Sequence, residues 1–256
     1  MIHPSAIVHP GANLDSSVEV GAFAVIGEGV NIDAGTKVGT HCNVSGPCDI
    51  GRDNVIFQFA SIGEAPQDLS YDGEPTRLVL GDRNTIREFV TLNRGTEKGG
   101  GETRIGNDNL IMAYCHVAHD CVVGNKTVFS NAASLAGHVV VGDHAILGGF
   151  TGVHQFVHIG EFAFTGFHSA VSQDVPPFCL ASGNLASVRG INRIGLKRHG
   201  FDDADIKGLQ KILFGFRNAK IRQEYLLNLA ETSLSPSQRR LVDFIKHSTR
   251  GVSLKD

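Results

Sequence analysis

Three histidines in the second half of the chain, His119, His138 and His154, have a spacing that could carry out chemistry. Each follows, by one to three residues, one of three aliphatic residues spaced 18 apart: Val117, Leu135 and Val153. If 18 residues make one turn of a repetitive fold, the three imidazoles line one edge of successive turns. Any one of these histidines alone is more typical of a surface or packing residue, but we favour a functional interpretation for the three together.

Imidazoles on an outer edge admit two chemistries. A neutral His119 could remove a proton from a hydroxyl nucleophile, with Asp120 or a carbonyl group orienting the ring. Three imidazoles could instead bind zinc between subunits. In either case a polar loop that contains Gln67 and Asp68 could hold a polar substrate.

Aliphatic residues at six-residue intervals predict the element that positions these histidines. The register runs from Val8 to Ile62, resumes at Leu80, and runs again from Ile105 to Val171. A helix cannot keep every sixth residue on one face, whereas short strands joined by tight corners can. Regular hexapeptides are typical of a parallel β-helix, in which each coil buries its apolar side chains against the next coil.

The register is interrupted twice and ends near residue 175. Polar, turn-rich segments are inserted at 64–75 and 94–101, and we expect them to leave the coil as loops on the binding face. Beyond residue 192 we expect helices, because Asp202 and Ser235-Pro236 are typical helix starts and Gly251 is a typical helix end. The sequence therefore predicts a β-helix domain at 1–190 and an α-helical domain at 191–256.

Composition and charge narrow the class of protein. The 256 residues contain neither a long apolar run nor a secretory signal. Five cysteines without a CxxC pair indicate buried thiols in a reduced, cytosolic protein. Residues 1–188 have 9 Lys and Arg against 19 Asp and Glu, and residues 189–256 have 14 against 7, which together give the net charge of −3. The basic segment suggests an acidic partner, or an ordinary solvated helical surface, and we expect no nucleic-acid binding.

Several segments at matching spacings resemble one enzyme family along essentially the whole chain. They are Phe57–Glu64, Gly73–Arg77, His116-Val117-Ala118-His119-Asp120-Cys121, Leu135-Ala136-Gly137-His138-Val139, Val153-His154-Gln155-Phe156, Gln173–Pro177 and Gly195–Arg198. The sequence is similar to the UDP-N-acetylglucosamine O-acyltransferases, which begin lipid A synthesis. The resemblance implies a left-handed parallel β-helix with a C-terminal α-helical domain, in a cytoplasmic homotrimer with sites between subunits.

The resemblance also implies a reaction and roles for individual residues. A 3-hydroxyacyl chain would pass from acyl carrier protein to the 3-hydroxyl of UDP-N-acetylglucosamine, without a metal or a dissociable cofactor. His119 would be the general base with Asp120 supporting it, and the Gly137 N–H would be the oxyanion donor. Substrate contacts are expected from Gln67, Asp68, His116, His138, His154, Gln155, Asn192 and Arg198.

The chain departs from the common family pattern at Ser70, Asn93, Ile194 and His199, and most sharply at Phe167. Phe167 stands where the acyl-length determinant of the family often has Gly or Met. We interpret its ring as shortening the acyl groove, the alternative being a ring that simply packs on the coil. A zinc-dependent hydratase, a non-catalytic scaffold and an acyltransferase for another amino sugar remain alternatives.

Overall fold

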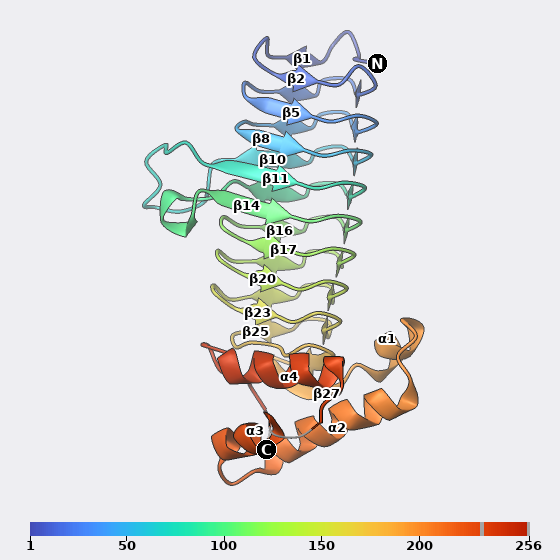
Figure 1. Ribbon diagram of the computed structural model, residues 1–256. Helices are drawn as coiled ribbons and strands as arrows, with labels where there is room; N and C mark the ends of the chain where they lie inside the picture. The colour runs from blue at the N-terminus through green and yellow to red at the C-terminus, as the bar shows by residue number, and fades with distance from the viewer. Residues whose placement is uncertain (231–232, 255–256) are drawn as a thin grey trace.

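The chain forms a straight, three-sided column of coils that is closed at one end by helices (Figure 1). This computed structural model describes residues 1–230 and 233–254. Followed from the N-terminus, the coils wind in a left-handed sense (Figure 1). The predicted left-handed parallel β-helix with a C-terminal helical domain is therefore confirmed.

Each side of the column is a sheet with one short strand per coil. The first sheet contains β1 (Ile7–Val8), β4 (Val25–Ile26), β7 (Asn43–Val44), β10 (Ser61–Glu64), β13 (Thr91–Asn93), β16 (His116–Val117), β19 (Ser134–Leu135), β22 (Gly152–Val153) and β25 (Ala170–Val171). The second contains β2 (Asn13–Leu14), β5 (Val30–Ile32), β8 (Cys48–Ile50), β11 (Arg77–Leu80), β14 (Glu102–Ile105), β17 (Val122–Val123), β20 (Val140–Val141) and β23 (His158–Ile159). The third contains β3 (Glu19–Val20), β6 (Lys37–Val38), β9 (Val55–Ile56), β12 (Thr85–Ile86), β15 (Leu110–Ile111), β18 (Val128–Phe129), β21 (Ile146–Leu147), β24 (Phe164–Thr165), β26 (Cys179–Ser182) and β27 (Ser187–Ile191), the last two antiparallel.

The hexad residues point into the column and form its core. Leu135 pairs in register with Val117 on one side and Val153 on the other, and all three are buried. Three residues after an aliphatic position the chain turns a corner with positive φ, as at Asp120 (62°) and His138 (63°). These left-handed corners keep the strands short and place side chains of successive coils one above another.

Both inserted segments leave the coil where the first sheet ends, and together they form the projection at the side of the column (Figure 1). One joins β10 to β11, and the other joins β13 to β14 and contains the short 3-10 helix Glu97–Gly99. Arg94 holds them together, because its guanidinium donates to the Tyr71 hydroxyl at 3.0 Å and to the Gly63 carbonyl at 3.0 Å. The prediction of two ejected loops is confirmed.

The described residues form four helices at the C-terminal end of the column: α1 (Arg193–Arg198), which projects at its side, α2 (Asp203–Asn218), α3 (Arg222–Ala230) and α4 (Pro236–His247). Asp202 caps α2, and Ser235 caps α4 in a capping box with Gln238, as the sequence predicts. The helix end expected at Gly251 is wrong, because α4 ends at His247 with Ser248 as its C-cap. The chain then returns to the column, where Val252 bridges to Asp174.

All five cysteines are buried and free, as expected. Burial raises the pKa of the Cys115 and Cys121 thiols to about 12, so these thiols stay protonated and are poor metal ligands. Within the described residues, no helix combines the length and the apolarity needed to cross a bilayer.

Candidate active site

The centre of the candidate site is His119, at the corner that follows β16. Only 6% of His119 is exposed, and its Nδ1 lies 2.7 Å from Oδ2 of Asp120. The left-handed backbone at Asp120 folds this side chain back onto the neighbouring ring. The predicted orientation of the imidazole by Asp120 is thus present in the structure.

The carboxylate of Asp120 is held on both of its oxygens. Oδ1 accepts from the Thr96 N–H at 2.7 Å, and Oδ2 accepts from the Thr96 hydroxyl at 2.6 Å. The Asp120 N–H donates to the Thr103 hydroxyl at 2.7 Å. Because an ionised carboxylate only accepts hydrogen bonds, the proton of neutral His119 lies on Nδ1 and its Nε2 is free to act as a base.

Gly137 lies against the imidazole from the next coil. A Cβ on Gly137 would come within 2.5 Å of the His119 Cε1 and 2.8 Å of its Nε2, so only glycine fits at this position. Among the described residues, the Gly137 N–H donates to no acceptor, whereas its carbonyl accepts from the Phe156 N–H at 3.2 Å. A free backbone donor beside an imidazole is an arrangement that can stabilise an oxyanion.

His138 and His154 continue the edge toward the C-terminus. The ring of His138 meets that of His119 edge-on at 5.2 Å between centroids and stacks on Phe156 at 4.4 Å. The exposed His154 has its Nδ1 3.3 Å from the carbonyl oxygen of Gln155. The predicted edge of three imidazoles on successive coils is confirmed.

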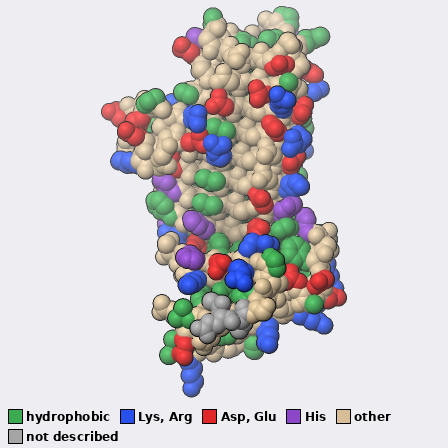
Figure 2. Space-filling model, viewed as in Figure 1, with side chains coloured by type: hydrophobic (Ala, Val, Ile, Leu, Met, Phe, Trp, Pro, Cys, Tyr) green, Lys and Arg blue, Asp and Glu red, His purple; other side chains and the backbone are tan. Residues whose placement is uncertain are grey.

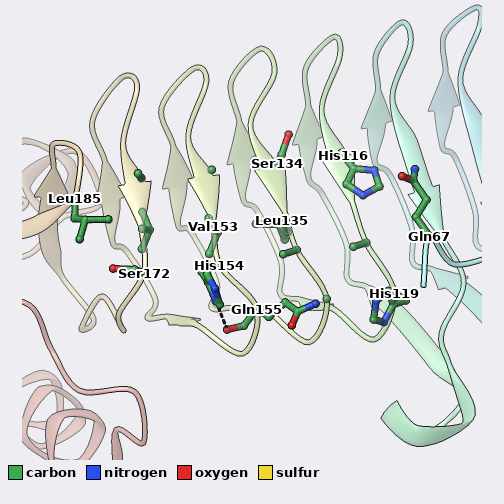
Figure 3. Close-up of a pocket in the computed structure, with 16 residues that line it drawn as sticks. Gln67, His116, His119, Ser134, Leu135, Val153, His154, Gln155, Ser172 and Leu185 are labelled. Atoms are coloured by element: carbon green, nitrogen blue, oxygen red, sulfur yellow. Dashed lines mark hydrogen bonds between the residues drawn. The ribbon is translucent and has the colours of Figure 1, made fainter. Parts of the chain in front are cut away.

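A groove of about 560 Å³ runs beside this edge, over the outer face of the first sheet. Six of the predicted residues line it: Gln67, His116, His119, Gly137, His154 and Gln155. Figure 3 shows His116 and Ser134 on the strands, with His119, His154 and Gln155 at the corner and Leu185 at the far end. The outward positions next along the sheet are Gly152 and Ala170, so the floor of the groove becomes apolar toward the C-terminus.

His116 lies on the groove floor, on strand β16. Its Nδ1 is 2.7 Å from the Thr91 hydroxyl oxygen. Burial lowers the pKa of His116, and the charge on a protonated His119 lowers it further. His116 therefore stays neutral to a lower pH than a free imidazole does.

Asp68 stands beside Gln67 in the first inserted loop and does not itself line the groove. A hydrogen bond from the Ser70 N–H (2.9 Å) is the main cause that lowers the pKa of Asp68, and the Ser70 hydroxyl and the charge of His119 act in the same direction. Asn93 donates to the Ala65 carbonyl at 2.9 Å. Ser70 and Asn93, two positions that the sequence analysis singled out, thus support the loop that carries Gln67 and Asp68.

Three predicted residues lie away from this groove within one chain. Asn192 caps α1 and donates to the Phe162 carbonyl at 3.0 Å, and Arg198 is exposed at the end of the same helix. Phe167 lies at the corner between the third sheet and the first, where it contacts Phe150 and is 67% exposed. Asn192 lines a separate cavity of about 420 Å³ beside α1.

Sequence reasoning missed the residues that support the site from the loops, chiefly Thr96, Thr103 and Arg94. They belong to or flank an insertion that lacks the hexad register, so the six-residue spacing could not predict where their side chains lie. The only available signal was that the insertion precedes the His119 coil.

Figure 2 shows histidine side chains on the C-terminal half of the column, close to the helical domain.

Comparison with known proteins agrees with this geometry. Residues 174–253 match the family model for UDP-N-acetylglucosamine O-acyltransferase, domain 2, and residues 102–137 match that for bacterial transferase hexapeptide repeats. The acyl-[acyl-carrier-protein]–UDP-N-acetylglucosamine O-acyltransferases of Halorhodospira halophila and Herminiimonas arsenicoxydans are each 54% identical to the chain, over 98% of both sequences. Solved structures of LpxA from Acinetobacter baumannii (41% identity, TM-score 0.96) and of UDP-N-acetylglucosamine O-acyltransferase from Moraxella catarrhalis (42%, 0.95) each match 98% of this chain and 99% of theirs. The chain therefore belongs to the UDP-N-acetylglucosamine O-acyltransferase family.

Proposed function

We propose that the protein transfers a 3-hydroxyacyl chain from acyl carrier protein to the 3-hydroxyl of UDP-N-acetylglucosamine, the first step of lipid A synthesis. The observation that carries this proposal is the buried His119–Asp120 pair, which opens onto the groove beside the unpaired Gly137 N–H. The close relatives named for this reaction supply the substrates.

The geometry supports a general-base mechanism. His119 Nε2 takes the proton of the sugar hydroxyl while the hydroxyl oxygen attacks the thioester carbonyl carbon, and the Gly137 N–H donates to the oxyanion that forms. The C–S bond then breaks, the sulfur leaves with the electron pair, and His119 returns the proton to it. Asp120 keeps the proton on Nδ1 and stabilises the imidazolium. A base of this kind contributes about 10²–10⁴-fold in rate.

The shape of the groove supports an assignment of its two ends. Gln67 and the imidazole edge would supply polar groups for the sugar nucleotide, with Asp68 next to Gln67 in the same loop, and the end between Gly152 and Leu185 would supply an apolar trough for the acyl chain. We place Phe167 at the limit of that trough, as the residue that selects a shorter chain.

A homotrimer would bring the distant residues to the site. Asn192 and Arg198 lie at the two ends of α1, and Phe167 lies on a corner of the column other than the His119 edge. A closed ring of identical subunits apposes different surfaces of neighbours. We propose that these three residues complete the groove of the adjacent subunit. The basic 189–256 segment, with 14 Lys and Arg against 7 acidic residues, would face the acidic carrier protein in the cytoplasm.

One observation favours a metal site instead. Ligand atoms of His119, Asp120 and His138 lie within 4.8 Å of one another. Oδ2 of Asp120, the oxygen nearest both histidines, already accepts from the Thr96 hydroxyl and from His119, so a cation on that oxygen would have to displace one of these donors. This donor set supports acyl transfer without a metal.

Product analysis of the wild-type protein tests the proposal. Purified protein is mixed with UDP-N-acetylglucosamine and a series of 3-hydroxyacyl carrier proteins, and the products are identified by mass spectrometry. We expect an O-acylated nucleotide sugar whose yield peaks at one chain length and survives chelator treatment. Stoichiometric zinc, with activity lost on chelation, would support the metal alternative, and acylation of only another amino sugar would correct the acceptor.

A further inference from the structure

The second inserted loop encloses the carboxylate of Asp120. Thr96, only 5% exposed, lies directly before the 3-10 helix Glu97–Gly99 and faces this carboxylate. Gly99 packs so closely that a Cβ on it would overlap the carboxylate. The side chain of Asp120 is 0% exposed, so the loop excludes water from it.

Thr96 fixes the plane of the carboxylate. Its N–H donates to Oδ1 at 2.7 Å, and its hydroxyl donates to Oδ2 at 2.6 Å. Oδ2 is also the oxygen that accepts from His119 Nδ1 at 2.7 Å. A carboxylate held on both oxygens cannot rotate, and the imidazole bonded to it is therefore held in one orientation.

The loop itself is anchored on two sides. The Gly95 N–H donates to the Arg77 carbonyl, and the Gly101 N–H donates to the Thr96 carbonyl at 2.8 Å. Arg94 ties the same segment to Tyr71 in the loop that carries Gln67 and Asp68. Thr96 is thus a fixed donor rather than a mobile one.

We infer that Thr96 is a positioning residue for the reaction, which acts on His119 through Asp120. The expected effect of Thr96 on the reaction rate rests on the proposed function, whereas its expected effect on the imidazole of His119 does not. Without the hydroxyl, Oδ2 loses one donor and interacts more strongly with an imidazolium, so His119 holds a proton up to a higher pH. The ring also loses its fixed orientation.

The test compares Thr96→Val, which removes only the hydroxyl, with Thr96→Ser, which keeps it. Thr36→Val is the matched control, because Thr36 is a fully buried threonine on an early coil whose hydroxyl donates to the Gly51 carbonyl at 2.7 Å. We measure kcat, KM for UDP-N-acetylglucosamine, the pH profile of kcat/KM and thermal unfolding. The histidine resonances are titrated by NMR without substrates, and His119 is assigned from the His119→Ala spectrum.

For Thr96→Val we expect kcat to fall about tenfold, the order for losing one hydrogen bond to a charged group, with KM unchanged. The acid limb of kcat/KM and the NMR midpoint of His119 should both move to higher pH. Thr96→Ser should restore kcat and both midpoints, and Thr36→Val should change only the unfolding temperature.

The outcomes separate this inference from the proposed function. If the wild type fails to turn over, the proposed function is wrong, and the NMR midpoints still support or overturn the positioning role. If the wild type turns over and Thr96→Val leaves kcat and the His119 midpoint unchanged, the inference is overturned. It is also overturned if Thr96→Val loses kcat only in proportion to the fraction of protein that is unfolded.

Discussion

His119, Asp120 and Gly137 form one chemical unit because the coil places their corners in contact. His119 and Asp120 are adjacent in sequence, and Gly137 lies one coil further on, against the imidazole. The geometry of the site therefore depends on the absence of a side chain at Gly137 as much as on the side chains of His119 and Asp120.

Replacing Gly137 with Ala should displace the base. The added methyl group would meet the His119 ring at 2.5 Å, which is too close for any Cβ, so the ring must move. A displacement of about 1 Å can cost about 100-fold in rate, and we expect kcat to fall by that order. Gly190→Ala is the control, because a Cβ there meets nothing within 4 Å. Equal kcat values for the two variants would contradict the account.

The acid limb of the pH profile should contain no contribution from His116 or Asp68. Burial lowers the pKa of His116, and hydrogen bonding from Ser70 lowers the pKa of Asp68. As the pH falls, His116 stays neutral and Asp68 stays ionised below the usual ranges of about 6.5 and 3.9 for these residue types. We therefore expect the acid limb of kcat/KM to lie at the same pH in His116→Gln as in the wild type. A limb that moves in His116→Gln would show that His116 takes up a proton in that range.

At the scale of elements, the hexad register was sufficient to predict the strands, the two loops and the edge of histidines. Each coil repeats the same backbone path, so a position within the hexad translates directly into a place on the column. The inserted loops have no such register. For this reason the contact of Thr96 with Asp120, and the support of Asp68 by Ser70, could be found only from the structure.

The position of Phe167 on its corner leads to a separate prediction about the preferred length of the acyl chain. The exposed ring of Phe167 packs over Gly149 and projects from the column, where it can limit an acyl chain in an adjoining groove. Phe167→Gly should move the preferred acyl length upward in the carrier-protein series, with the rate on the original length reduced. Phe89→Gly, the same change at an exposed ring on the same kind of corner, should leave the preference in place. An unchanged preference in Phe167→Gly would instead favour simple packing on the coil.

At the scale of the whole molecule, the site residues divide between different edges of one chain. The sequence could assign Asn192 and Arg198 to the site only through family resemblance, because the helical domain lies outside the hexad register. In the structure these residues lie beside α1, apart from the His119 groove. The proposed trimer accounts for this separation.

Mixed oligomers test the shared site. His119→Ala and Arg198→Ala should each be nearly inactive alone, since each removes one half of every site. When the two chains are co-expressed and purified together, about a quarter of the sites in a randomly mixed ring should be intact, and activity should return to that level. Native mass spectrometry gives the subunit number in the same samples. Activity that stays at the level of the single variants would mean that each site is built from one chain.

A comparison of three proteins tests whether His119 acts as the general base for acyl transfer to UDP-N-acetylglucosamine. Single-turnover rates are measured for the wild type, for His119→Ala and for His9→Ala, a change at an exposed histidine near the N-terminal end of the column. We expect a loss of about 10²–10⁴-fold in His119→Ala alone, with the fold retained. A His119→Ala protein that transfers the acyl chain at the wild-type rate would rule out His119 as the base.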